Sequence, residues 1–114
     1  MRKIAVTAGS GRLATAILEA LARVKDTSQL VGIARTPDKF RFSDIEVRKG
    51  DYNHRHEMKD ALQGVGTLVL VSGMAEPDER IVQHRNVIVA AKDAGVKKIV
   101  YTSIAGAPSG TWFD

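Results

Sequence analysis

The sequence predicts an α/β domain in which parallel strands alternate with helices, and three observations support this. Short apolar runs of strand length recur from Lys3–Thr7 to Ile99–Thr102. Segments with the apolar spacing of helices lie between them, and hairpin turns do not. Glycine or proline stands at most junctions. Such connections require right-handed crossovers and a parallel sheet covered on both faces, for which we expect the strand order 3-2-1-4-5.

The first unit is a strand followed by a helix. The strand Lys3–Thr7 is stopped by Gly9 and Gly11. The residues after these glycines repeat with helical spacing, which predicts an amphipathic helix. Its apolar side consists of Leu13, Ile17, Leu18, Leu21 and Val24.

The second and third strands lie close together along the chain. Leu30–Ala34 is a continuous apolar stretch, after which Thr36 and Pro37 predict an N-cap and the first position of a short helix. Ile45–Arg48 alternates apolar and charged residues, as strands covered on one side do. We therefore expect this third strand to be outermost.

Two further strands and two helices complete the pattern. A helix over His56–Leu62 is closed by Gly64, and Thr67–Val71 predicts a strand buried on both faces. Pro77 opens the longest helix and Gly95 ends it, ahead of the fifth strand, Ile99–Thr102. The apolar side of that helix consists of Ile81, Val87, Ile88, Ala91 and Ala94.

The last residues are predicted to form a loop. Residues 106–111 are rich in glycine, proline and serine, and Trp112 and Phe113 follow with no element left to bury them. We expect the chain to be the dinucleotide-binding part, residues 1–114, of a longer protein. The outer edge of the fifth strand is then covered by further sequence or by a partner chain.

The composition restricts which classes of protein and of ligand fit this chain. The 114 residues suit one domain, cysteine is absent, and no apolar run is long enough for a signal peptide or a spanning helix, so we expect a cytoplasmic protein. The net charge of +4 admits anionic partners, but the basic residues are scattered, which argues against nucleic acid. His54, His56 and His84 lack the spacing of metal ligands, so we interpret them as surface residues without a metal.

A glycine motif follows the first strand. Residues 9–14, Gly-Ser-Gly-Arg-Leu-Ala, fit G-x-G-x-x-G/A between a strand and a helix, the context of Rossmann-type dinucleotide binding. Gly9 allows the tight turn, Gly11 lets the pyrophosphate approach the backbone, and Ala14 permits close helix packing. A plain glycine turn is the alternative. Candidate cofactor contacts here are Thr7, Gly9, Ser10, Gly11, Arg12 and Leu13.

Arg35, at the end of the second strand, favours NADP(H) over NAD(H). An acid is expected there when the ribose 2′-hydroxyl is bound, and this sequence has none. The planar guanidinium of Arg35 suits a 2′-phosphate, and Arg12 adds a second charge. Alternatively, Arg35 is a solvated loop residue and Asp38 or another group contacts the ribose.

Further candidates follow the other strands. Asp51 and Tyr52 follow the third strand and are placed near the adenine. The remaining candidates, near the ribose or the nicotinamide, are Ser72, Gly73, Thr102 and Ser103. Each of these positions also fits turn chemistry or a strand end.

Taken together, these motifs resemble the NmrA-like branch of the atypical short-chain dehydrogenases, especially the bacterial NAD(P)H-dependent quinone reductases. The resemblance rests on residues 6–14, 34–37, 50–52, 83–88, 94–96 and 101–103. Family members more often carry T-G-A-T-G-x-L-G in the loop, so Ala8 and Ala14 stand where glycines are usual. Ala8 is the departure that can disturb the turn unless Gly9 takes over its role.

The resemblance implies hydride transfer from NADPH to a quinone or similar acceptor. A reduced quinone takes its proton from water, which agrees with the missing Tyr-x-x-x-Lys pair: His56 stands four residues after Tyr52, and Ala105 four after Tyr101. Catalytic residues are therefore not assigned. In such proteins the second half of the chain builds the acceptor pocket, so we expect residues 1–114 alone to be inactive. A non-catalytic NmrA-like redox sensor is the alternative, and a homodimer stays open.

Overall fold

The strands and helices alternate along the chain as predicted. The structure is a computed structural model that describes residues 2–8, 11–71, 77–102 and 108–112. Within these residues six strands form one sheet in the order β3-β2-β1-β4-β5-β6. Their bounds are β1 (Lys3–Thr7), β2 (Leu30–Ala34), β3 (Glu46–Lys49), β4 (Val65–Val71), β5 (Lys98–Thr102) and β6 (Pro108–Trp112).

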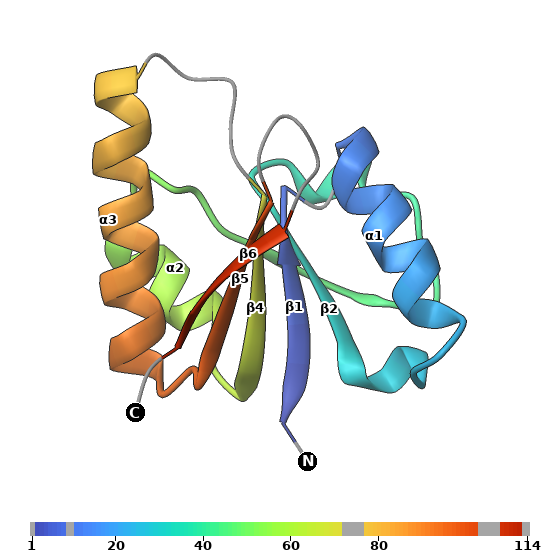
Figure 1. The fold of residues 1–114 in the computed structure, drawn as a ribbon. Helices are drawn as coiled ribbons and strands as arrows, with labels where there is room; N and C mark the ends of the chain where they lie inside the picture. Colours follow the sequence, from blue (N-terminus) through green and yellow to red (C-terminus); the bar gives the residue numbers. More distant parts are fainter. Residues whose placement is uncertain (1, 9–10, 72–76, 103–107, 113–114) are drawn as a thin grey trace.

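The first five strands are parallel, and the predicted order 3-2-1-4-5 is confirmed. Helix α1 (Arg12–Ala22) covers one face of the sheet, and α2 (Arg55–Ala61) and α3 (Pro77–Ala94) cover the other (Figure 1). The third strand lies at an edge, as its half-covered pattern indicated. The result is a doubly wound Rossmann-type sheet whose parallel strands all end at one edge.

The prediction of a loop was wrong for residues 108–111, and the outer edge of β5 is covered by this chain's own residues rather than by further sequence or a partner chain. Residues 108–112 form β6, which pairs antiparallel with β5, Thr102 lying opposite Pro108 and Lys98 opposite Trp112. Pairing satisfies the backbone groups that an edge strand leaves exposed, and this outweighs the low strand propensity of glycine and proline. Proline is tolerated here because it is the first residue of an edge strand.

Three apolar residues expected on buried helix faces are exposed instead. Leu13, Val24 and Ile81 are 40%, 74% and 59% exposed, respectively. Val24 lies beyond the end of α1 at Ala22. Ile81 lies in the first turns of α3, which extend beyond the sheet (Figure 1), because 18 helical residues span about 27 Å and a five-residue strand about 17 Å. Periodicity alone therefore overstated the buried length of both helices.

The helix predicted after β2 is a single 3₁₀ turn. It covers Pro37–Lys39, and the Thr36 side chain makes no capping hydrogen bond. Phe40 follows the turn and lies over β2, where a Cβ on Gly32 would be 2.3 Å from its ring. Aromatic packing thus ends the turn early and accounts for a glycine inside a buried strand.

Each face of the sheet carries its own core. On the α2/α3 face, Leu68 and Leu70 of β4 pack with Met58 of α2 and Val87 of α3. On the α1 face, Val71 joins a second cluster that consists of Val6, Ala14, Leu18, Leu30 and Ile45. β4 thus contributes to both clusters, which confirms that it is a strand buried on both sides.

Ion pairs connect elements at the edge of the sheet where the parallel strands β1 and β3 begin. Glu46 of β3 forms ion pairs of 2.8 Å with both Lys3 and Arg48. Hydrogen bonds from Arg48 and Lys3 lower the pKa of Glu46 to about 2. Arg48 also donates to the carbonyls of Ala61 and Gln63, at 2.9 and 2.6 Å, and so caps the end of α2.

Among the described helices, none has the length and apolar character needed to cross a membrane.

Candidate functional site

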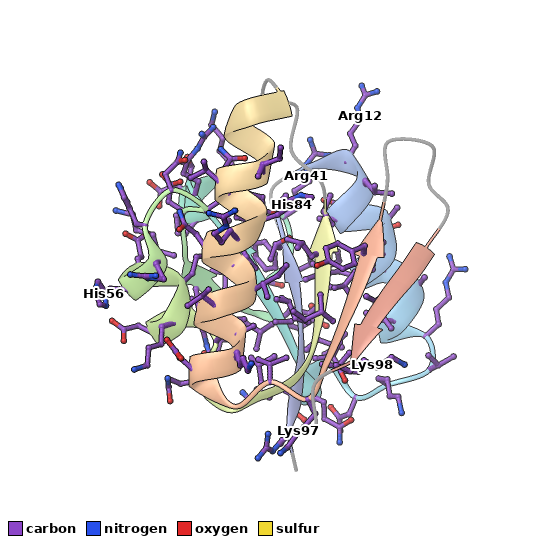
Figure 2. All side chains as sticks on the ribbon, turned by 60° about the vertical axis from the view of Figure 1, so that its left-hand side comes forward. Arg12, Arg41, His56, His84, Lys97 and Lys98 are labelled. Atoms are coloured by element: carbon purple, nitrogen blue, oxygen red, sulfur yellow. The ribbon has the colours of Figure 1, made fainter. Side chains whose placement is uncertain are left out.

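The candidate site lies where the strand order reverses, at the carboxyl ends of β1 and β4. From β1 the chain runs by way of α1 to β2, whereas β4 lies on the opposite side of β1. In sheets of this type ligands bind in the crevice that opens at this switch point. Arg12, at the start of α1, projects from the same end of the domain (Figure 2).

Ala8 takes the strained backbone conformation that turns the chain out of β1. Its φ is +56°, in the left-handed region that favours glycine, and its carbonyl accepts a 2.8 Å hydrogen bond from the Gly11 amide. The expectation that Gly9 allows the turn stays a prediction, and the structure shows that Ala8 also takes part in the turn. Gly9 and Ser10 lie outside the described residues. An alanine in this conformation costs roughly 1–2 kcal/mol.

We predict that Ala8→Gly raises the free energy of unfolding by about 1 kcal/mol, because glycine adopts a positive φ without a Cβ clash. Urea unfolding followed by circular dichroism measures the change. Ala20→Gly, on the exposed side of α1, is the matched control and is expected to lower stability by about 1 kcal/mol. A loss of stability in both variants would contradict the assigned strain.

Gly11 keeps the N-terminus of α1 uncovered. Its φ of −85° and ψ of 166° suit any residue, so its backbone does not explain the glycine. As the N-cap it has no side chain to occupy the N–H groups of the first turn, and a Cβ would lie 3.2 Å from the Ala8 carbonyl oxygen. The first turn contains no acid and begins with Arg12. The positive end of the helix dipole is thus free for an anion.

Thr7 and Tyr52 form a hydrogen-bonded bridge between β1 and β4. The Thr7 side chain is fully buried, and its hydroxyl accepts from the Val71 amide at 2.8 Å. The Tyr52 hydroxyl is hydrogen-bonded to the Thr7 hydroxyl and donates to the Val71 carbonyl at 2.7 Å. Burial raises the pKa of Tyr52 to about 12, so it keeps its proton at neutral pH. The Tyr52 hydroxyl is thus bound between the strands, and a contact of Tyr52 with the adenine stays a prediction.

Arg35 and Asp51 follow neighbouring strands. Ala34, which ends β2, is paired with Lys49 of β3, so the residues after them share one edge of the sheet. Arg35 is exposed there. The Asp51 carboxylate accepts from the Asn53 amide at 2.9 Å, as in a turn, and its contact with a cofactor stays a prediction.

The remaining candidates are placed in part. Leu13, the second residue of α1, is partly exposed beside Arg12. Thr102 ends β5 opposite Val71, at the edge of the crevice, but its side chain is outside the described part. The residues Ser72, Gly73 and Ser103 also lie outside it.

The sequence did not indicate the residues that attach α3 to this region. Asn86 donates to the Tyr52 carbonyl at 3.1 Å, and Gln83 donates to the Asn53 side chain at 3.4 Å. Two amides three residues apart lie on one helix face, which was the available signal. These contacts join α3 to the turn that follows β3.

His84 corrects the interpretation of the histidines. His56 points away from α2 into solvent, whereas His84 is half-buried with its ring centroid 5.9 Å from that of Tyr101 (Figure 2). The prediction of a surface residue is therefore wrong for His84. Across residues 2–8, 11–71 and the later described segments, no three His, Asp or Glu side chains are grouped as metal ligands.

Comparison with known proteins assigns the family. The model of a family described as NAD(P)H-binding matches residues 8–113. The chain belongs to this NAD(P)H-binding family. In sheets of this type a dinucleotide binds at the switch point and at the start of the first helix, so the residues that contact the cofactor here stay a prediction.

The relatives of this NAD(P)H-binding domain include reductases. It is 44% identical to quinone oxidoreductase 2 of Escherichia coli (strain K12) over 104 residues, which are 89% of this chain and 36% of that protein. The solved complex of the E. coli NADPH-dependent quinone oxidoreductase with NADPH is 45% identical, with a TM-score of 0.81, and the match covers 88% of this chain and 36% of that one. The predicted resemblance to quinone reductases is confirmed.

A second solved relative is the triphenylmethane reductase of Citrobacter sp., complexed with NADP(H). It is 39% identical, with a TM-score of 0.84, and the match covers 89% of this chain and 37% of that one. The NAD(P)H-binding domain thus spans little more than a third of the length of these relatives. The cofactor class, NAD(P)H, agrees with the prediction.

Proposed function

We propose that this domain binds NADPH as the hydride donor of a reductase whose acceptor is a quinone or a similar conjugated molecule. The glycine loop carries the proposal, because Gly11 leaves the start of α1 open at the crevice where the strand order reverses. NADPH supplies a hydride from its nicotinamide ring, and the domain holds and orients that cofactor.

The preference for NADPH is supported by Arg35 and Arg12. Arg35 is an exposed cation at the end of β2, where an acid would repel a 2′-phosphate. Arg12 adds positive charge at the start of α1. Two relatives were solved with NADP(H) or NADPH bound. A guanidinium binds a phosphate with two parallel hydrogen bonds, which NADH cannot offer at this position.

The acceptor is proposed from chemistry and from the reductase relatives. A quinone accepts the hydride and takes a proton from water, so it needs no tyrosine and lysine pair. One relative is named a quinone oxidoreductase and another a triphenylmethane reductase, which supports an acceptor with extended conjugation. We further propose that residues 1–114 are the cofactor-binding part of a longer cytoplasmic reductase. The sensor alternative has no support in these relatives, and a homodimer stays a prediction.

We expect calorimetric titration to give tight binding of NADPH and much weaker binding of NADH. Arg35→Ala should lower NADPH affinity roughly 10- to 100-fold, because a hydrogen bond to a charged group contributes about 1.5–3 kcal/mol. The affinity for NADH should change less than about twofold, since NADH lacks the phosphate that Arg35 would bind.

Arg23→Ala is the matched control, because Arg23 is an exposed arginine at the opposite end of α1. It should leave both affinities unchanged. Equal losses for both cofactors in Arg35→Ala would reject the assigned phosphate contact. A folded chain that binds neither cofactor would reject the proposed function.

A further inference from the structure

The backbone ladder between β1 and β4 ends before the crevice begins. Its last pair is Val6 with Val69, although β4 continues to Val71. Two site loops leave the sheet here, one through Ala8 and the other after Val71. Their separation is therefore not set by strand pairing between Val71 and β1.

Side chains replace the missing backbone bonds. The Val71 amide donates to the Thr7 hydroxyl at 2.8 Å, and the Val71 carbonyl accepts from Tyr52 at 2.7 Å. The Tyr52 hydroxyl also donates to the Thr7 hydroxyl, which in turn donates to the Val69 carbonyl at 3.4 Å. The single hydroxyl proton of Tyr52 is thus shared between acceptors on β1 and β4. Tyr52 therefore links the two strands through its hydroxyl.

Tyr52 is itself held from outside these strands. It follows β3, two strands away from β1, and packs on the core of the α2/α3 face. Its carbonyl accepts from Asn86 of α3, and the preceding Asp51 closes a turn with the Asn53 amide. The backbone of Tyr52 is therefore fixed by α3 and by this turn, and its hydroxyl can hold β1 and β4 at a defined spacing.

We propose that Tyr52 is a positioning residue that fixes the distance between the β1 loop and the end of β4, and thereby aligns the two halves of the bound dinucleotide. The inference rests on the proposed binding of NADPH. The Tyr52 hydroxyl acts through Thr7 and Val71 rather than by binding the cofactor itself. Its burial keeps the hydroxyl protonated, as donation to the Val71 carbonyl requires.

The test compares NADPH with a ligand that has only the adenosine half of the dinucleotide. This comparison separates an effect on the alignment of the two halves from a general loss of stability. In Tyr52→Phe we expect NADPH affinity to fall about 5- to 10-fold, the effect of one hydrogen bond. Adenosine 2′,5′-bisphosphate carries the 2′-phosphate but no nicotinamide half. Its affinity should change less than about twofold, because it does not depend on the alignment of two halves. Hydrogen exchange at the Val71 amide should become faster in the ligand-free variant.

Tyr101→Phe is the control, since it removes a tyrosine hydroxyl from β5 on the same face of the sheet. It should leave both affinities and the Val71 exchange rate unchanged. Equal losses for the two ligands in Tyr52→Phe, or unchanged NADPH affinity in the folded variant, would overturn the proposal. If wild type binds no NADPH, the proposed function fails; an unchanged Val71 exchange rate in the variant would separately overturn the bridge.

Discussion

Gly11→Val is expected to lower the affinity for NADPH roughly 100-fold, because two charge-assisted hydrogen bonds at the start of α1 would be lost. The branched side chain would occupy the space in front of the first helical N–H groups, and its Cβ would lie 3.2 Å from the Ala8 carbonyl oxygen. The backbone angles at Gly11 are ordinary for valine, so the fold should persist. Calorimetric titration of the folded variant measures the loss.

Ala20→Val is the control for this substitution. It adds a similar volume to α1 on its exposed side, and should leave NADPH affinity within about twofold of wild type because it is remote from the phosphates. Thermal unfolding of both variants confirms that each is folded. Wild-type affinity in Gly11→Val would show that the pyrophosphate does not approach this glycine.

Leu68→Ala is expected to lower the free energy of unfolding by about 2–5 kcal/mol, the usual cost of a cavity in a well-packed core. Leu68 is fully buried on β4, and its strand is paired with both β1 and β5. A loss of this size is a large fraction of the roughly 5–15 kcal/mol that stabilises a typical domain. Urea unfolding with linear extrapolation gives the value.

Val24→Ala provides the comparison for the core substitution, since Val24 is 74% exposed. It should change stability by less than about 0.5 kcal/mol. A similarly small change in Leu68→Ala would contradict the assignment of β4 to the centre of the core.

The pattern of apolar residues predicted the parallel sheet, because the burial of each strand and helix determines that pattern. Residues 68–71 are apolar without interruption, and helices cover both faces of that strand. β6 was missed because Pro108 and Gly110 are poor strand residues, and their pairing depends on an edge that is present only in the folded sheet. Local composition could not indicate that long-range contact.

The site was predicted where a motif carries its own geometry. The spacing of Gly9 and Gly11 predicted a phosphate loop between β1 and α1, but it could not show that Ala8 has a positive φ. The role of Tyr52 depends on contacts with Thr7 and Val71, which are 45 and 19 residues distant. Such contacts exist only after the strands are assembled, so the sequence could not indicate the bridge.

The antiparallel course of β6 determines what the intrinsic fluorescence of the domain reports. Trp112, the sole tryptophan in the sequence, is paired with Lys98 at the start of β5. Thr102, at the crevice end of the same strand, is four residues away, or about 13 Å along the strand. Tryptophan emission is therefore an optical probe of whether the edge strand is docked. Emission from bound NADPH would monitor the crevice, so the two ends of the sheet can be followed at separate wavelengths in one sample.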